Sequence, residues 1–273
     1  MTRLTRKIAM VTGGASGLGR AIAQRLASDG ATVVITDRQQ ELGRVVAAEF
    51  GFEFYEQDVC REESWTSIMC EIEARHARLD VLVNNAGVLG PTDAASPEST
   101  RLVDWKVVFG VNVEGTFLGC RAAIALMRRT GGGSIVNISS IAGLMATPYA
   151  TAYGASKAAV RHLTKSVAQH CAQQGLKIRC NSVHPGTVRT SLWNLHAEEV
   201  ARERGVSLDE IIVESQREIP LGDFTKAEDV AAAVSFLASD DARHMTGAKL
   251  IVDGGVVNCA TYRASSAISQ PQA

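Results

Sequence analysis

Short apolar runs alternate with amphipathic segments along most of the chain. The clearest runs cover residues 8–11, 32–35, 81–83, 135–138, 178–183 and 250–252, and residues 52–55 add a seventh. The runs are continuous rather than alternating, which is typical of strands that are buried on both faces of a sheet. The pattern therefore predicts the seven strands of a parallel sheet.

The segments between these runs carry apolar residues at helical spacing. Leu18, Ile22 and Leu26 recur every four residues and form one apolar stripe. The same kind of stripe recurs later in the chain, at Trp65, Ile68, Met69 and Ile72, and again at Val230, Val234 and Leu237. The repeated order of strand, helix and strand predicts an α/β fold: a single Rossmann-type, doubly wound domain with a seven-stranded parallel sheet and helices on both faces.

The composition narrows the possible classes of function. Of the 273 residues, 46% are apolar and 21% are charged, which is ordinary globular usage and excludes a disordered chain. The formal net charge of −1 provides no excess of basic residues for a nucleic-acid backbone. Thr12 and Gly13 interrupt the first apolar run, so we expect neither a signal peptide nor a membrane span, and a cytoplasmic location. No histidine or cysteine cluster has metal-ligand spacing, and we expect no metal.

A glycine-rich turn, Thr-Gly-Gly-Ala-Ser-Gly-Leu-Gly, follows the first predicted strand. It places glycines at 13, 17 and 19, with Ser16 and Leu18 beside them. Glycines let the backbone approach a pyrophosphate closely, and the free amides at the start of the next helix receive its negative charge. The spacing differs from the general G-x-G-x-x-G fingerprint, so a purely structural turn remains the alternative at this point.

Asp37 directly follows the second predicted strand. A carboxylate at this position accepts hydrogen bonds from the adenosine ribose and repels a 2′-phosphate, which favours NAD over NADP. Arg38 is the competing feature, because a nearby arginine accommodates that phosphate. The end of the strand aims its first following residue at the ribose, and NAD is therefore the expected cofactor.

Tyr153 and Lys157 are four residues apart in a predicted helix. This spacing puts the phenol and the ammonium group on one face, with their Cβ atoms about 5–6 Å apart. An adjacent cation favours the phenolate, so we expect a lowered Tyr153 pKa and a role as proton acceptor. The pair alone is also compatible with an exposed tyrosine and lysine without function.

Two further residues favour a catalytic role for the Tyr153–Lys157 pair over an exposed pair without function. Ser140 follows the strand predicted at 135–138, and Asn112 lies inside a predicted helix, where asparagine has poor propensity. With these motifs in this order, the chain resembles the short-chain dehydrogenase/reductase family in its compact, single-domain form. Within that family, the segments 4–7, 170–172 and 179–186, together with Trp65 in its predicted helix, resemble bacterial hydroxysteroid and alicyclic secondary-alcohol dehydrogenases.

The resemblance implies a catalytic role for each of four residues. Tyr153 is the general base in alcohol oxidation, Ser140 hydrogen-bonds the substrate oxygen, and Lys157 lowers the tyrosine pKa and holds the nicotinamide ribose. Asn112 anchors a water that connects Lys157 to solvent. Ser139 is the alternative to Ser140, although only one of two neighbours in an extended segment faces the site.

The resemblance also implies which residues bind the cofactor. Asp58 and Val59 contact the adenine ring, and residues 185–190 contact the nicotinamide, while His184 is expected to be a packed strand-end residue. The full implied set is Gly13, Ser16, Gly17, Leu18, Gly19, Asp37, Asp58, Val59, Asn85, Ala86, Gly87, Tyr153, Lys157, Pro185, Gly186, Val188 and Thr190.

The substrate pocket is expected to be mainly apolar. Its candidate residues, each equally compatible with ordinary core, are Ser140, Leu144, Met145, Tyr149, Leu192 and Trp193. An apolar pocket favours a hydrophobic secondary alcohol or ketone, such as a cyclic alcohol or a hydroxysteroid, over a polyol. The small-molecule partner is therefore a secondary alcohol or ketone, and no nucleic acid or membrane is expected as a partner.

No linker marks a domain boundary. We expect one dinucleotide-binding catalytic domain over residues 1–259 and a flexible tail over residues 260–273. The segment 189–225 lacks a strand run and is expected to be either a lid over the site or a surface helical hairpin. The resemblance further implies a homotetramer, with a dimer as the alternative, formed through residues 100–130 and 153–175 and the last strand.

Two alternatives to an NAD-dependent alcohol dehydrogenase remain. One is an NADPH-linked ketoreductase of acyl or xenobiotic ketones, against which Asp37 argues. The other is a catalytically idle NAD-binding regulator, which would not need to retain Asn112, Ser140, Tyr153 and Lys157 together.

Overall fold

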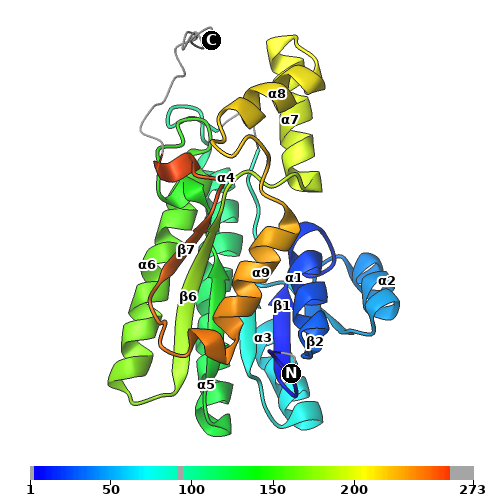
Figure 1. Ribbon diagram of the computed structural model, residues 1–273, viewed down its shortest axis with the longest axis vertical. Helices are drawn as coiled ribbons and strands as arrows, with labels where there is room; N and C mark the ends of the chain where they lie inside the picture. Colours follow the sequence, from blue (N-terminus) through cyan, green and yellow to red (C-terminus); the bar gives the residue numbers. More distant parts are fainter. Residues whose placement is uncertain (1–2, 92–94, 259–273) are drawn as a thin grey trace, which may run out of the picture.

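Seven parallel strands form the centre of the structure, a computed structural model that describes residues 3–91 and 95–258 (Figure 1). Their order across the sheet is β3-β2-β1-β4-β5-β6-β7, and every neighbouring pair is parallel. The prediction of a seven-stranded parallel sheet is confirmed. The strands are β1 (Ile8–Thr12), β2 (Thr32–Asp37), β3 (Glu53–Glu56), β4 (Val81–Asn84), β5 (Gly133–Ile138), β6 (Ile178–Pro185) and β7 (Lys249–Val252).

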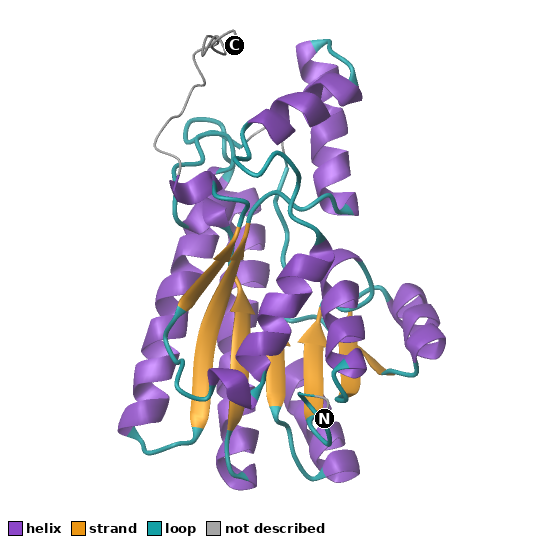
Figure 2. Ribbon diagram, viewed as in Figure 1, coloured by secondary structure: helices purple, strands orange, loops and turns teal. Residues whose placement is uncertain are grey.

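Helices cover both faces of the sheet (Figure 2). The α-helices are α1 (Gly17–Ser28), α2 (Gln40–Phe50), α3 (Glu62–His76), α4 (Leu102–Phe109), α5 (Gly115–Thr130), α6 (Thr151–Gln173), α7 (Ser191–Arg204), α8 (Leu208–Arg217) and α9 (Ala227–Ala238). The described part also contains three short 3-10 turns, η2 (Ile141–Gly143), η3 (Asp240–Ala242) and η4 (Val256–Asn258), and one π-helical turn, η1 (Gly110–Glu114).

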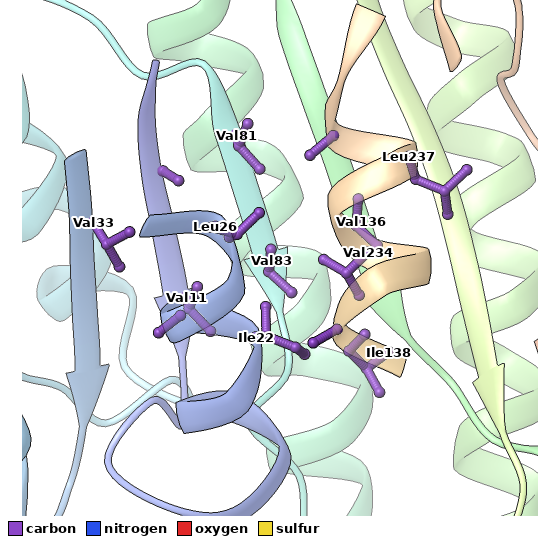
Figure 3. Close-up of a cluster of buried hydrophobic side chains, with 14 of the residues drawn as sticks. Val11, Ile22, Leu26, Val33, Val81, Val83, Val136, Ile138, Val234 and Leu237 are labelled. Atoms are coloured by element: carbon purple, nitrogen blue, oxygen red, sulfur yellow. The ribbon is translucent and has the colours of Figure 1, made fainter. Parts of the chain in front are cut away.

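The two faces carry separate apolar cores. On one face, Ile22 and Leu26 of α1 and Val234 of α9 pack against valines of β1, β4 and β5 (Figure 3). On the other face, Trp65 of α3 and Cys120 of α5 belong to a second buried cluster with residues of β1, β4, β5 and β6. Because each central strand is covered on both sides, its sequence is a continuous apolar run rather than an alternation.

The strand order reverses between β1 and β4. From β1 the chain proceeds to β2 and β3 on one side of the sheet, and from β4 it proceeds to β5, β6 and β7 on the other. The segments that follow β1 and β4 therefore diverge at the carboxyl edge, and in open α/β sheets ligands bind in the crevice at such a switch point.

The helical stretch from α4 to α5 is not a continuous α-helix. Gly110–Glu114 forms a π-helical turn, η1, which contains Asn112. The stretch Leu102–Thr130 is long and apolar enough to cross a membrane by length and composition alone. In the structure, however, α5 buries Ala123 and Leu126 against the central sheet as a core helix of the domain.

The segment between β6 and α9 stands beyond the carboxyl ends of the strands (Figure 1). Its helices α7 and α8 share a small apolar cluster formed by Ala197, Ala201 and Ile211. The segment is therefore a pair of packed helices on the same edge of the sheet as the switch point. The tail expected at residues 260–273 lies outside the described residues.

Candidate active site

The glycine-rich turn connects β1 to α1 at the switch point. Gly13 and Gly17 have φ angles of 64° and 49°, in the left-handed region that favours glycine. Gly19 is packed so tightly that a Cβ atom there would overlap the carbonyl oxygen of Gly13. Ser16, the N-cap of α1, makes no capping hydrogen bond through its side chain, and the first turn of α1 contains no acidic residue. The start of α1 is thus suited to receive an anion.

Asp37 lies at the end of β2 and holds this turn in place. One carboxylate oxygen accepts a hydrogen bond from Ala15 N at 3.3 Å, and the other accepts one from Gln39 N at 3.0 Å. The side chain is largely buried, whereas Arg38 is exposed. Asp37 therefore connects the glycine-rich turn to the start of α2.

The turn after β4 is hydrogen-bonded to the end of β1. Asn85 N and Ala86 N each donate to Thr12 Oγ1 at 3.0 Å, and Asn85 Nδ2 donates to Thr12 O at 2.9 Å. Gly87 follows and is exposed. These bonds bring the predicted residues of the two turns together on one side of the crevice.

Asp58 and Val59 follow β3 at the same edge. Asp58 is exposed and accepts a hydrogen bond from Cys60 N at 3.0 Å, while the buried Val59 accepts one from Trp65 Nε1 at 3.0 Å. The second bond anchors this turn to α3.

Ser140, Tyr153 and Lys157 meet where β5 ends beside α6. Lys157 Nζ donates to Ile138 O at 3.0 Å and lies 5.5 Å from the centre of the Tyr153 ring. The Tyr153 and Ser140 hydroxyls are hydrogen-bonded. Ser139 instead points toward α6 and donates to Lys157 O at 2.8 Å. The structure thus places Ser140, rather than Ser139, next to the tyrosine.

The pKa of Tyr153 shifts in the direction opposite to the expected one. Burial raises the pKa of the phenol above its ordinary value, and the hydrogen bond with Ser140 opposes this shift. Burial also lowers the pKa of the Lys157 ammonium group to about 8. Desolvation of the phenolate is the largest contribution, and it acts against the decrease in the Tyr153 pKa that was expected from the neighbouring Lys157.

Asn112 is buried in the π-helical turn and faces the turn after β4. Its Nδ2 donates to Val88 O and to Ser156 Oγ, both at 2.9 Å, and its Oδ1 accepts from Val88 N at 2.8 Å. A Cβ atom on Gly87 would lie 3.2 Å from Asn112 Oδ1 and 3.3 Å from Lys157 Nζ. Gly87 therefore lies between these two side chains, and a larger residue would crowd both.

The segment after β6 approaches the glycine-rich turn. Gly186 N donates to Val252 O at 2.8 Å, and Val188 is bridged to Thr225. Thr190 caps α7 by accepting a hydrogen bond from Trp193 N at 3.3 Å. A Cβ atom on Gly17 would lie 3.6 Å from Thr190 Cγ2, so the base of α7 lies across from the start of α1.

The predicted substrate residues differ in their surroundings. Met145 and Tyr149, after Ser140, are exposed, with 45% and 79% of their surface accessible, and Leu144 is partly buried. Trp193 packs edge-on against Phe224, with ring centres 5.0 Å apart. Leu192 lies in α7, and its side chain is not among those described.

Sequence reasoning missed two contributions to this region. Phe224 packs against Trp193 from a segment just before α9, and Arg189 lies over both rings at 5.9 Å. His184, expected only to be packed, also makes polar contacts: its ring lies between Ser182 Oγ and the Ser140 carbonyl. No local pattern in the sequence signals either arrangement.

Comparisons with known proteins give matches over most of the chain. A family model described as enoyl-(acyl carrier protein) reductase matches residues 13–257. A 3-beta-hydroxysteroid dehydrogenase of Comamonas testosteroni is 38% identical over 93% of this chain and 97% of its own. A cyclopentanol dehydrogenase of Comamonas sp. (strain NCIMB 9872) is 41% identical over 93% of this chain and 98% of its own. An NADP-dependent (R)-specific alcohol dehydrogenase of Lentilactobacillus kefiri is 37% identical over 93% of this chain and 97% of its own.

Proposed function

Because this chain belongs to the short-chain dehydrogenase/reductase family, we propose that it is an NAD-dependent oxidoreductase that interconverts a secondary alcohol and a ketone. The observation that carries the proposal is the meeting of Ser140, Tyr153 and Lys157 beside the dinucleotide crevice. The relatives are dehydrogenases of secondary alcohols, which supports an oxidoreductase activity.

The residues around the crevice fit a nicotinamide dinucleotide. Gly17 and Gly87 are both exposed, and side chains at these positions would project toward Thr190 and toward Asn112 and Lys157, respectively. The start of α1 would hold the pyrophosphate, Asp37 the adenosine ribose, and residues 185–190 the nicotinamide end. When bound, the nicotinamide supplies the acceptor for hydride from the carbinol carbon.

Tyr153 and Ser140 manage the proton at the substrate oxygen. In oxidation, the alcohol O–H proton passes to Tyr153 Oη while the carbinol C–H bond breaks. The Ser140 hydroxyl donates a hydrogen bond to the same oxygen and stabilises the charge that develops there. In reduction, the neutral phenol returns its proton to the oxygen, and the raised pKa of Tyr153 keeps the phenol in that form.

Lys157 and Asn112 support this exchange. The Lys157 ammonium group would bind the nicotinamide ribose and hold positive charge near Tyr153 Oη. Asn112, fixed by Val88 and Ser156, keeps the π-helical turn next to Lys157 and would anchor the water that leads protons to solvent.

The choice of NAD over NADP rests on Asp37. Its carboxylate is fixed at the end of β2 by two backbone amides, so it does not swing away from the ribose position. A 2′-phosphate there would meet a negative charge. An NADPH-linked ketoreductase is the alternative. It is favoured by the neighbouring Arg38 and by the one relative that is NADP-dependent by name.

We assign the substrate to the class of apolar cyclic alcohols or hydroxysteroids. Leu144, Met145 and Tyr149 follow Ser140, and Trp193 lies in the first turn of α7. These side chains offer apolar surface rather than the several polar partners a polyol needs. We further propose that residues 189–225 act as a lid that covers the bound substrate.

The exposed surface of α4 and α5 supports a homotetramer. Four large apolar side chains on these helices are exposed, namely Leu102, Val103, Val107 and Phe117. Exposed apolar side chains of this size are typical of contacts between subunits. Light scattering is expected to give the mass of four chains, and a monomer would contradict the assignment.

An idle NAD-binding regulator is the alternative in a different class of function. Calorimetry with NAD and a turnover assay with cyclopentanol separate the two. An enzyme binds NAD and forms NADH, whereas a regulator binds NAD and forms none. Binding without turnover on any secondary alcohol would overturn the proposal.

A further inference from the structure

His184 is a buried polar side chain that the mechanism above does not use. It lies in β6, directly before Pro185, and none of its surface is accessible (0%). Its Nε2 atom lies 2.9 Å from Ser182 Oγ, and its Nδ1 atom lies 3.1 Å from the carbonyl oxygen of Ser140. Both ring nitrogens therefore have a partner.

These two partners determine the tautomer. A carbonyl oxygen only accepts hydrogen bonds, so Nδ1 carries the hydrogen and donates it to Ser140 O. Nε2 of the neutral ring is then an acceptor. The Ser182 hydroxyl also lies 3.4 Å from the Ala248 carbonyl oxygen, but Nε2 is the nearer acceptor at 2.9 Å and receives its hydrogen. Ser182 is itself buried, with 1% of its surface accessible, so water does not replace this bond.

The Ser140 carbonyl is the anchor of the short turn η2. It also accepts a hydrogen bond from Gly143 N at 3.1 Å, and Ser140 Oγ accepts one from Ala142 N at 3.1 Å. The backbone and the side chain of Ser140 are thus held by the same turn. The hydroxyl hydrogen is left to point toward Tyr153 or toward a substrate oxygen.

We propose that His184 is a positioning residue, which fixes the Ser140 carbonyl and so orients the Ser140 hydroxyl toward the reacting oxygen. The inference rests on the proposed function and extends it from the residues that touch substrate to one that acts through Ser140. It also connects two parts of the site. His184 precedes the Pro185-Gly186 turn on the nicotinamide side, and its ring reaches from β6 to the end of β5.

Two substitutions separate the hydrogen bond from the packing. His184→Asn keeps an N–H group at the position of Nδ1, whereas His184→Leu has a similar size and no donor. We expect the amides of residues 140–145 to exchange with deuterium faster in the Leu variant, and kcat to fall by about tenfold or more, because a small displacement of a catalytic group is costly. In the Asn variant, the exchange rate and kcat are expected to lie within about threefold of the wild-type values. The affinity for NAD is expected to be unchanged in the Leu and the Asn variant.

Each outcome bears on one claim. A Leu variant with wild-type exchange and kcat overturns the role of His184, and so does an Asn variant as impaired as the Leu variant. If the wild-type protein shows no turnover, the proposed function is overturned. Amide exchange at residues 140–145 in the His184 variants then still tests whether His184 fixes the Ser140 carbonyl. If the Leu variant does not fold, His184→Met replaces it. Met also lacks a donor to the Ser140 carbonyl and fills the space with a flexible side chain, and wild-type exchange at residues 140–145 in this variant would then contradict the proposal.

Discussion

The ammonium nitrogen of Lys157 lies 5.5 Å from the centre of the Tyr153 ring, on the same face of α6. The same nitrogen is buried and donates to the Ile138 carbonyl at 3.0 Å, which ties α6 to the end of β5. Burial acts on both groups: it raises the pKa of the phenol and lowers that of the ammonium group to about 8. The charged form of each is therefore costly in this environment.

Removal of the Tyr153 hydroxyl tests its role in proton transfer. Tyr153→Phe keeps the ring and removes the group that exchanges a proton with the substrate oxygen. We expect kcat to fall by about a hundredfold or more, in line with general acid–base catalysis, while the dissociation constant for NAD stays near the wild-type value. Steady-state kinetics and calorimetry measure the two quantities. A variant with most of the wild-type rate would exclude Tyr153 as the proton acceptor.

The raised pKa of Tyr153 predicts opposite pH profiles for the two directions. Oxidation requires the phenolate, and a pKa above its ordinary value keeps this form scarce near neutral pH. We therefore expect kcat/KM for alcohol oxidation to increase with pH above neutrality, and kcat/KM for ketone reduction to be retained at neutral pH. Rates across a pH series in both directions check this. An oxidation profile already level below neutral pH would contradict it.

Burial of Lys157 predicts a pH-dependent stability. The folded-state pKa is about 8 and the ordinary value is 10.5, so between these values the unfolded chain binds more protons. Stability contributed by this group is present above 10.5 and is lost as the pH falls through about 8, a difference of about 3 kcal/mol. In Lys157→Met this contribution is expected to be absent. The free energy of unfolding in urea is measured for the wild type and for Lys157→Met over this pH range. If it depends on pH in the same way in both proteins, the lowered pKa of Lys157 is contradicted.

Substitution of Asp37 tests the choice of cofactor. Asp37→Ala, with Arg38 retained, is expected to shift the ratio of kcat/KM for NAD over NADP toward NADP by about tenfold or more, because the charge that repels the 2′-phosphate is removed. Asp37→Asn is the matched control, since its amide oxygen still accepts one of the bonds from Ala15 N and Gln39 N. A similar shift in both variants assigns the effect to charge. An unchanged ratio in both would refute the role of Asp37.

The strands and the glycine-rich turn at the end of β1 were predictable from local patterns. Runs such as residues 81–83 and 135–138 are continuous because both faces of the sheet are covered, and Tyr153 and Lys157 share a helical face by spacing alone. The glycine-rich turn adopts the left-handed backbone at Gly13 and Gly17 that its sequence suggests.

The features that were not predictable depend on contacts between distant segments. His184 and Ser140 are 44 residues apart, and they meet only because β5 and β6 pair in one particular register. Phe224 reaches Trp193 through the return of the chain after α8. The pKa of Tyr153 rises because the fold desolvates its phenol, an effect that the spacing of the tyrosine and the lysine in the sequence does not reveal.

The most direct test of the proposed function is NADH formation with a graded panel of secondary alcohols. Purified protein is mixed with NAD, or with NADP in parallel, and with small polyols, cyclopentanol, cyclohexanol and hydroxysteroids. Turnover with NAD, concentrated among the cyclic alcohols and steroids, is the predicted result. Turnover only with polyols would contradict the apolar substrate pocket. Binding of NAD without turnover of any alcohol in the panel would contradict the proposal that the protein is a dehydrogenase.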